Sequence, residues 1–260
     1  MIEIIPGHLY DYPKYYDLVF GSDWKAEFDF LNSCFQEHST RRIHRLFEPA
    51  CGTGRLLIKL AEAGYDVVGN DLNPKAVAYC NARFQRRGFQ PAAVVGDMAD
   101  FQLSQKADAA YNMINSFRHL PSEKSAERHL NCVARALAKG GIYVLGLHLT
   151  PTRGDRVEEE SWSARRGNLG VISSLWSDKL DLRARNEEVC VTFDVYTPTR
   201  RFRITDRMNH RTYTARQMQQ LLKKVPSFDV VATYDFLYEL DSPITVGPET
   251  EDVVYVLRRS

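Results

Sequence analysis

Residues 46–71, LFEPACGTGRLLIKLAEAGYDVVGND, decide the fold of this chain. A short apolar segment leads into a tight turn that carries Gly52 and Gly54, and leucines and an isoleucine then recur on one side of a predicted helix. Gly64 occupies the place of the glycine that commonly follows a helix C-terminus. A second apolar strand over 66–69 ends just before Asp71. This order predicts a parallel sheet whose ligand lies over the turn and the helix N-terminus, at the carboxyl ends of the strands.

The turn itself distinguishes between ligands. The dinucleotide fingerprint G-x-G-x-x-G needs a third glycine beside the pyrophosphate, and Leu57 stands at that position. Glu48, four residues before Gly52, can accept hydrogen bonds from an ammonium group, while the turn amides can receive a carboxylate. Asp71 can hold both hydroxyls of a ribose. These groups occur together in S-adenosylmethionine, which we predict as the cofactor; an ordinary βαβ turn without a cofactor is the alternative.

The composition limits the classes of function. A chain of 260 residues with 44% hydrophobic residues is long enough for one large domain with a sizeable insertion. The net charge is +1 and no stretch is polybasic, so nucleic acid is not an expected partner. The five cysteines are scattered, and no signal peptide or membrane span is apparent, which predicts a cytoplasmic protein without membrane contact. No His/Cys/Asp cluster has the spacing of metal ligands, so no metal is expected.

Hydrophobic periodicity predicts the remaining elements. Alternating apolar residues over 155–213 indicate an antiparallel insertion, because strand side chains repeat every second residue. The other predicted elements are a helix from Ser22, a helix begun by Asn73 and Pro74, strands over 92–95 and 108–114, a helix from Ser122 through Leu137 stopped by Gly140 and Gly141, a strand over 142–149, a helix opened by a capping box at Thr214, and strands near 228–236 and 252–258.

Several motifs together resemble the class I methyltransferases that use S-adenosylmethionine. These motifs are EPACGTG over 48–54, Asp71, GDM over 96–98 and the stretch over 108–120. The N-terminal run YDL over 16–18 followed by DWKAE over 23–27, the insertion and the Thr214 helix narrow the resemblance. It is then to the subgroup with sugar-amine N,N-dimethyltransferases and glycine/sarcosine N-methyltransferases. The resemblance implies a doubly wound, seven-stranded, mostly parallel α/β sheet with an antiparallel β insertion after the fifth strand.

The resemblance also implies a division of the chain and a set of site residues. Residues 1–42 would form an N-terminal aromatic flap and helix, residues 43–154 and 214–260 the cofactor-binding domain, and residues 155–213 a lid or an oligomer contact. The implied cofactor contacts are Glu48, Ala50, Gly52 and Gly54 at the methionine end, Asp71 at the ribose, Leu72, Asp97 and Met98 around the adenine, Asn112 and Met113 under the sulfonium, and Tyr16 closing over the cofactor. Simple packing of the N-terminal tyrosines is an equal alternative to the flap.

Methyl transfer from a sulfonium is an in-line displacement with a neutral leaving group, so no catalytic acid is expected. A hydroxyl or a protonated amine as acceptor needs a general base. His148, at the end of the fifth predicted strand, is the candidate base or acceptor contact, because strand ends face the ligand crevice; a structural histidine is the alternative. His119 is a second candidate, and Tyr213 can either reach the acceptor or pack in the core.

We therefore expect a methyltransferase, monomeric or homodimeric, that acts on nitrogen or oxygen of a small molecule. The fourth predicted strand ends without the Asp/Asn-Pro-Pro-aromatic run of enzymes that methylate nucleobase amines or protein glutamine. Three alternatives stay open: a protein that binds S-adenosylmethionine or S-adenosylhomocysteine without chemistry, a nicotinamide oxidoreductase, and an RNA or protein methyltransferase.

Overall fold

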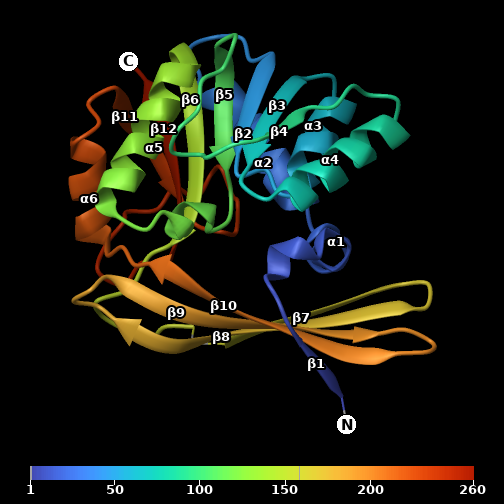
Figure 1. Cartoon of the computed structure of the whole chain (residues 1–260). Helices are drawn as coiled ribbons and strands as arrows, with labels where there is room; N and C mark the ends of the chain where they lie inside the picture. The colour runs from blue at the N-terminus through green and yellow to red at the C-terminus, as the bar shows by residue number, and fades with distance from the viewer. Residues whose placement is uncertain (1, 158) are drawn as a thin grey trace.

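Two β-sheets, one above the other, make up the architecture (Figure 1). The computed structural model describes residues 2–157 and 159–260. The upper sheet has seven strands in the order β11-β12-β6-β5-β2-β3-β4. Their bounds are β2 (Arg45–Pro49), β3 (Asp66–Asp71), β4 (Ala93–Val95), β5 (Ala107–Asn112), β6 (Leu137–His148), β11 (Phe228–Tyr234) and β12 (Asp252–Arg259). Strands β2 to β6 are parallel, and β12 lies antiparallel between β6 and β11. The predicted mostly parallel sheet is confirmed.

Helices cover both faces of this sheet. One face packs against α2 (Lys25–Glu37), α3 (Arg55–Glu62) and α4 (Pro74–Arg86), and the other against α5 (Glu123–Ala136) and α6 (Ala215–Lys223). The predicted caps form: Asn73 accepts from two backbone amides of α4, and Thr214 and Gln217 make a reciprocal capping box on α6. These contacts satisfy amides that have no partner within the helix.

One predicted helix end is wrong. α5 ends at Ala136 and β6 begins at the next residue, so Gly140 and Gly141 lie inside the strand. The reason is close packing between strands, because a Cβ atom on Gly141 would lie 2.3 Å from the carbonyl oxygen of Asp108 in β5. Glycine at this place permits the approach of two backbones and does not end a helix.

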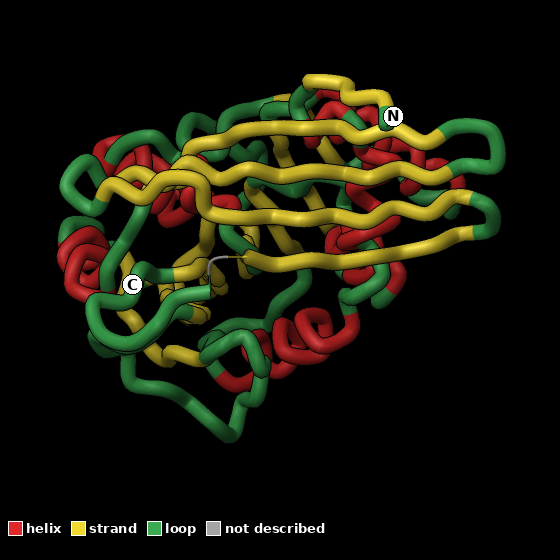
Figure 2. The backbone as a smooth tube through the Cα atoms, turned by 90° about the horizontal axis from the view of Figure 1, so that it is seen from below, coloured by secondary structure: helices red, strands yellow, loops and turns green. Residues whose placement is uncertain are grey.

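The lower sheet contains the predicted antiparallel strands and one strand that was not predicted. Its order is β1-β10-β9-β8-β7, and Figure 2 shows the long strands side by side with the helices behind them. The bounds are β1 (Glu3–Pro6), β7 (Glu159–Arg166), β8 (Leu169–Asp181), β9 (Asn186–Tyr196) and β10 (Arg201–Arg211). Strand β1 pairs parallel with β10 at the edge. The division of the chain into a flap, a cofactor domain and a lid or oligomer contact stays a prediction.

The N-terminal segment joins the two sheets. The short helix η1 (Leu9–Asp11) and α1 (Pro13–Phe20) lie between them (Figure 1). On α1, the buried Asp17 accepts hydrogen bonds from Arg83 at 2.6 Å and from the Tyr79 hydroxyl at 3.0 Å, both on α4. Arg83 also donates to the carbonyl oxygen of Thr53 in the glycine turn at 3.0 Å. α1 is therefore anchored beside the predicted cofactor site.

Candidate active site

The backbone of the glycine turn is left-handed at three positions, and only two of these positions are glycines. Ala50, Gly52 and Gly54 have φ angles of 54°, 52° and 70°, which lie in the left-handed region that favours glycine. A Cβ atom on Gly54 would lie 2.4 Å from Sγ of Cys80 on α4, so this glycine allows the turn to pack on that helix. A Cβ atom on Gly52 would meet no described atom within 4 Å. The turn therefore presents an open backbone surface at Gly52, as a ligand cradle requires.

Asp71 closes this cradle at the end of β3. Its Oδ2 atom accepts from the Gly52 backbone amide at 2.8 Å, and its Oδ1 atom accepts from the Asn73 amide at 2.8 Å. Burial raises the pKa of Asp71, while the two amide hydrogen bonds act in the opposite direction. Each carboxylate oxygen retains further acceptor capacity, because an ionised carboxylate offers about four lone-pair sites. The side chain can therefore hold the glycine turn and still accept from ribose hydroxyls.

Glu48 lies at the end of β2, where the sequence predicted an acid for the ammonium group. The Tyr111 hydroxyl donates to its Oε2 atom at 3.0 Å. Burial raises the pKa of Glu48 well above its ordinary value, while the Tyr111 hydrogen bond and the positive charge of Arg55 lower it. A cation bound next to this carboxyl group would favour its ionised form.

Two further residues of the site were missed in the sequence. Arg55, the first residue of α3, donates to Glu27 Oε2 at 2.7 Å and interacts electrostatically with Glu48 and Tyr16. A cation in the first turn of a helix opposes the helix dipole, and that unfavourable placement was the available signal. Tyr111 carried no such signal, because an aromatic residue inside a buried strand is the ordinary pattern.

Tyr16 and Tyr10 approach the same carboxylates from the N-terminal segment. Their ring centroids are 5.5 Å apart. Burial raises the pKa of both phenols, and Asp71 contributes to each shift. Glu48 also acts on Tyr16. Tyr16 thus lies near both predicted cofactor-binding acids, and its role in closing over the cofactor stays a prediction.

The residues predicted around the adenine differ in how accessible they are. Leu72 is 67% exposed next to Asp71, so its side chain is free for a ligand contact. Asp97 accepts from the Ala99 amide at 2.7 Å. Met98 is 7% exposed and packs in the core on the α5 side of the sheet. The adenine contacts of all three residues stay predictions.

The residues predicted under the sulfonium lie at the end of β5. Asn112 donates from Nδ2 to the Pro49 carbonyl oxygen at 2.8 Å, and its buried Oδ1 atom has no hydrogen-bond partner among the described residues. Met113 is 4% exposed within the core. Of these two residues, Asn112 is thus the one with a polar atom, Oδ1, that makes no hydrogen bond to another described residue.

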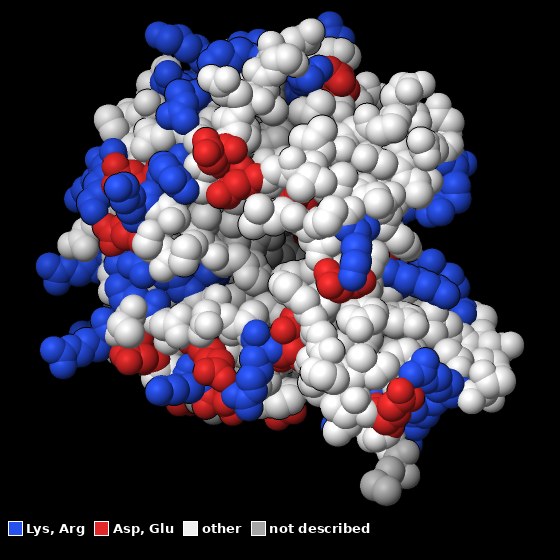
Figure 3. Space-filling model, in the orientation of Figure 1, with Lys and Arg blue, Asp and Glu red and all other residues white. Residues whose placement is uncertain are grey.

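A hollow separates the two sheets on the face shown in Figure 3. His119, at the end of the short helix η2 (Ser116–His119), makes a 2.9 Å hydrogen bond from Nε2 to the Tyr10 hydroxyl. His210 on β10 packs edge-on against His119, with ring centroids 4.7 Å apart. Burial lowers the pKa of His119 to about 4, with positive neighbours adding to the effect. His119 is therefore a neutral hydrogen-bonding group at neutral pH.

His148 ends β6 and lies in a polar cluster. Its Nδ1 atom is 2.6 Å from Oδ1 of Asp252, and its backbone amide donates to Oδ1 of Asn115 at 2.8 Å. Glu160 on β7 is close enough for His148 to lower its pKa, although burial is the larger effect and raises that pKa. The pairing leaves the Nε2 atom of His148 without a partner in the described part of the chain, as a general base requires.

Tyr213 lies in the core of the protein. The side chain is fully buried at 0% exposure, and its ring centroid lies 5.5 Å from that of Phe117 in the core. Its buried hydroxyl has no hydrogen-bond partner among the described residues. The ring packing fits the packing alternative, and contact of the hydroxyl with an acceptor stays a prediction.

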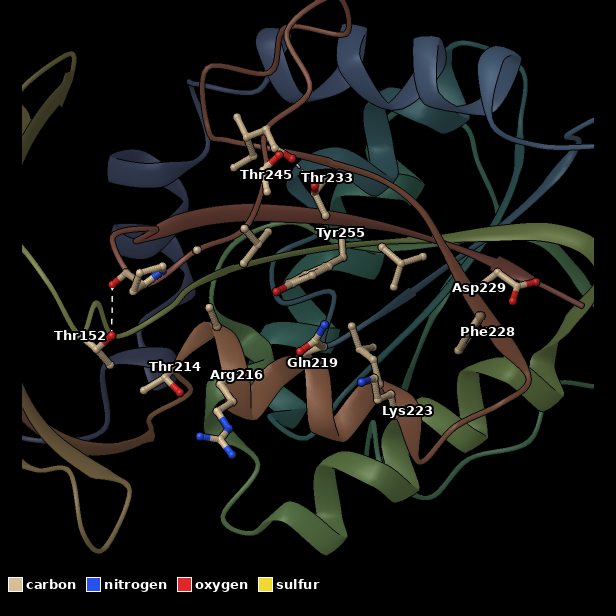
Figure 4. A pocket seen from close by; sticks show the side chains of 17 residues that line it. Thr152, Thr214, Arg216, Gln219, Lys223, Phe228, Asp229, Thr233, Thr245 and Tyr255 are labelled. Carbon is tan, nitrogen blue, oxygen red and sulfur yellow. Dashed lines mark hydrogen bonds between the residues drawn. The ribbon is translucent and has the colours of Figure 1, made fainter.

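A further groove lies away from the glycine turn. Its volume is about 1040 Å³, and it opens between α6, strands β11 and β12, and residues 244–248 (Figure 4). Tyr255, Gln219 and Thr233 line it. None of the predicted cofactor residues belongs to its lining, so this groove is distinct from the site at the glycine turn.

Similarity to known proteins agrees with this geometry. Residues 47–141 match a family model described as a methyltransferase domain. The match confirms the resemblance to methyltransferases that was predicted from the sequence.

Proteins similar in sequence to this chain include two enzymes named for amine substrates. The glycine/sarcosine N-methyltransferase of Halorhodospira halochloris is 32% identical over 138 residues, which cover 51% of this chain and 49% of the relative. The dTDP-3-amino-3,6-dideoxy-alpha-D-glucopyranose N,N-dimethyltransferase of Streptomyces fradiae is 31% identical over 135 residues, or 50% of either chain. The similarity therefore spans about half the length of each relative.

The whole fold of this chain has a crystallographic counterpart. An S-adenosylmethionine-dependent methyltransferase from Clostridium acetobutylicum superimposes with a TM-score of 0.76 over 97% of both chains, at 17% identity. This similarity includes the lower sheet, because nearly the entire chain is covered. No helix in residues 2–157 or 159–260 has the length and apolar character needed to cross a bilayer.

Proposed function

We propose that this protein transfers the methyl group of S-adenosylmethionine to the nitrogen of a small-molecule amine. One observation supports the proposal: a series of contacts runs from the carboxylates predicted for the cofactor to a histidine suited to an acceptor. Tyr16 and Tyr10 connect them, since Tyr16 lies near Glu48 and Asp71, and Tyr10 bonds to His119. The names of the two relatives favour nitrogen over oxygen as the acceptor atom.

The described residues fit the proposed cofactor. When bound, S-adenosylmethionine supplies an electrophilic methyl group on a sulfonium. The Gly52 backbone offers space beside the turn amides for the carboxylate, Asp71 can accept from the ribose, and Glu48 can pair with the ammonium group. Tyr16 can place its ring against the sulfonium, because a cation is attracted to the face of an aromatic ring. The donor and acceptor set thus matches each polar end of the cofactor.

His148 is the proposed general base. A protonated amine must lose a proton before its lone pair can attack, and the free Nε2 atom of His148 can take it. Asp252 holds the opposite ring nitrogen and stabilises the imidazolium that forms. His119, neutral because burial lowers its pKa to about 4, is suited to hydrogen bonding and positioning. Proximity and orientation alone can supply up to about 7–11 kcal/mol of barrier reduction.

The alternatives have less support. Leu57 is fully buried at the position where a dinucleotide site needs its third glycine, so there is no room there for close pyrophosphate packing. The net charge of +1 offers little attraction for RNA. We further propose a cytoplasmic location, because all five cysteines are free and buried. A monomer or a homodimer is compatible with the fold.

The test is S-adenosylhomocysteine formation by the full chain. Small amines, small alcohols and unfractionated tRNA are supplied separately with S-adenosylmethionine, and products are identified by mass. We expect product with amines alone, each gaining one or two methyl groups. Methylation confined to alcohols would move the acceptor atom to oxygen, and methylation confined to tRNA would replace the small-molecule proposal. If S-adenosylmethionine binds but no product forms, the protein binds the cofactor without catalysing methyl transfer.

A further inference from the structure

The lower sheet contributes a hydrogen-bonding atom that the fold does not use. His210, on β10, is 7% exposed. Its Nε2 atom is buried and has no hydrogen-bond partner within the part of the chain that the structure describes. Buried polar atoms in native proteins are nearly always paired, so each exception needs a physical reason. A partner supplied by a bound molecule is one such reason.

His210 faces the proposed acceptor site rather than the open side of the lower sheet. Its ring is perpendicular to that of His119, at 87°, with centroids 4.7 Å apart. Its pKa is lowered well below the ordinary histidine value by burial first and by His119, Arg118 and His148 next. These three neighbours come from η2 and from the end of β6, which places the imidazole at the wall opposite the upper sheet. The ring is therefore neutral at neutral pH.

Two arginines beside His210 are already paired with a carboxylate of the fold. Arg118 donates to one carboxylate oxygen of Glu187, the cross-strand neighbour of His210, at 2.5 Å. Arg156 donates to the other carboxylate oxygen at 2.5 Å and to Ser177 at 3.2 Å. A neutral imidazole beside paired charges matches a neutral hydroxyl, which can both donate and accept. An acceptor carboxylate would have to compete with Glu187 for these two arginines.

We propose that His210 determines acceptor specificity by hydrogen-bonding a hydroxyl group of the amine, so that the preferred acceptor is a hydroxylated amine. This inference rests on the proposed function, because it places the amine nitrogen near His148 and His119 and the hydroxyl on the lower sheet. A site that hydrogen-bonds a substrate hydroxyl rejects the analogue without it, since the buried partner is then left unpaired. The lower sheet would thus select the acceptor while the upper sheet binds the cofactor.

The experiment compares matched acceptors in three variants. The probes are trans-2-aminocyclohexanol against cyclohexylamine, and methyl 3-amino-3-deoxy-α-D-glucopyranoside against its 2-deoxy and 4-deoxy analogues, with glycine as the carboxylate probe. His210→Leu removes the hydrogen bond at similar size. His210→Gln retains an amide nitrogen that can replace Nε2. Asn209→Ala is the control, because Asn209 is the exposed neighbour on the same strand.

We expect the wild-type protein to prefer a hydroxylated amine by at least about tenfold in kcat/KM, in line with discrimination by hydrogen bonding. His210→Leu should lower kcat/KM for that acceptor to the level of its deoxy analogue, leave the analogue unchanged, and keep S-adenosylhomocysteine affinity. His210→Gln should recover part of the preference, and Asn209→Ala should keep all of it. Should His210→Leu fail to fold, His210→Ala takes its place, with the same expected loss of the hydroxyl preference.

Two results would overturn the role of His210. If His210→Leu lowers kcat/KM equally for hydroxylated and deoxy acceptors, the effect of the substitution is structural. If the wild-type protein does not prefer hydroxylated amines, or prefers glycine, the inference loses its basis. Both results leave amine methylation intact. If S-adenosylhomocysteine binds but no amine is methylated, the proposed function itself is wrong and the role of His210 is wrong with it.

Discussion

At the scale of single residues, Asp71 holds backbone amides and is also the predicted ribose ligand. It accepts from the Gly52 amide in the glycine turn and from the Asn73 amide at the start of α4. We expect Asp71→Ala to weaken S-adenosylhomocysteine binding by about 1.5–3 kcal/mol, the range for hydrogen bonds to charged groups. Isothermal titration calorimetry measures this change directly.

Asp66→Ala is the matched control for this prediction. Asp66 begins the same strand at its opposite end and is exposed, where it pairs with Arg45. Exposed ion pairs contribute about 0–1 kcal/mol, so this variant should bind the ligand like the wild type. Equal loss of affinity in both variants would show that Asp71 acts through stability and not through ribose contact.

Glu48 makes the stability of the ligand-free protein depend on pH. Burial raises its pKa in the folded state well above the ordinary value. A group with a raised folded pKa contributes stability that is complete below its unfolded pKa and is lost as the pH rises through the folded pKa. Glu48→Gln stays neutral and still offers an oxygen to Tyr111. We therefore expect it to unfold at a higher temperature than the wild type at pH 8 but at a similar temperature at pH 4.

Thermal unfolding from pH 4 to pH 8 tests this behaviour. The same variant should bind S-adenosylhomocysteine more weakly at pH 8, because the ammonium group of the ligand loses its carboxylate partner. A constant difference in unfolding temperature at all pH values would contradict the assigned environment of Glu48.

The sequence predicted these site residues unevenly, for a physical reason. Glu48, Gly52 and Asp71 occupy fixed positions in a local strand–turn–helix–strand unit, so their spacing along the chain carries the information. Tyr111 and His210 reach the site only through pairing of strands far apart in the chain. No local periodicity encodes such contacts.

At the scale of elements, the end of β6 holds the loop that carries His119. A Cβ atom on Gly146 would lie 1.9 Å from the carbonyl oxygen of Met113, and the Gly146 carbonyl accepts from the Asn115 amide at 3.3 Å. We expect Gly146→Ala to push η2 away from β6, with a loss of about 1–3 kcal/mol in unfolding free energy, as for other overpacked sites, and a lower rate of methyl transfer. Urea denaturation measures the first effect.

Gly170→Ala provides the comparison for Gly146→Ala. On β8, the nearest atom to its added Cβ would be the Tyr196 Cβ at 3.9 Å, an ordinary contact. This variant should keep both stability and activity. If Gly146→Ala behaved in the same way, close packing of the η2 loop on β6 would not be important.

α1 depends on one buried ion pair. Asp17 is 4% exposed and Arg83 is 9% exposed, and removal of one partner from a buried pair costs about 3–5 kcal/mol. We expect Asp17→Ala to destabilise the protein by this amount and to weaken cofactor binding, because Tyr16 is on the same helix. Asp29→Ala, which removes the exposed Lys25–Asp29 pair on α2, should have little effect on either measurement. If Asp17→Ala leaves the ligand affinity unchanged, α1 does not contribute to cofactor binding.

Long-range pairing also limited the prediction of elements. The helix begun by Asn73 and the capping box at Thr214 were predicted because caps are local signals. Strand β1 has only four residues and includes Pro6, and its pairing with β10 joins segments about two hundred residues apart. Gly140 and Gly141 were misassigned because a glycine pair marks both helix ends and close strand contacts.

At the scale of the whole molecule, the proposed site lies where the two sheets face each other. The glycine turn, Glu48 and Asp71 belong to the upper sheet, His210 belongs to the lower sheet, and α1 lies between the sheets (Figure 1). The upper sheet follows from its local βαβ pattern, and the strands of the lower sheet follow from alternation. Their relative placement depends on buried contacts such as Asp17–Arg83 and Arg118–Glu187, which the sequence does not reveal.

The most direct test of methyl transfer uses ¹³C NMR with S-adenosylmethionine labelled at its methyl carbon. The full chain is mixed with the labelled cofactor and the amine panel, and the methyl signal is followed. We predict that the signal leaves the sulfonium position and appears as an N-methyl group when a suitable amine is present, and stays in place without one. A signal that stays on the sulfonium with every amine, while calorimetry shows that S-adenosylhomocysteine binds, would contradict the proposed enzyme and leave a cofactor-binding protein.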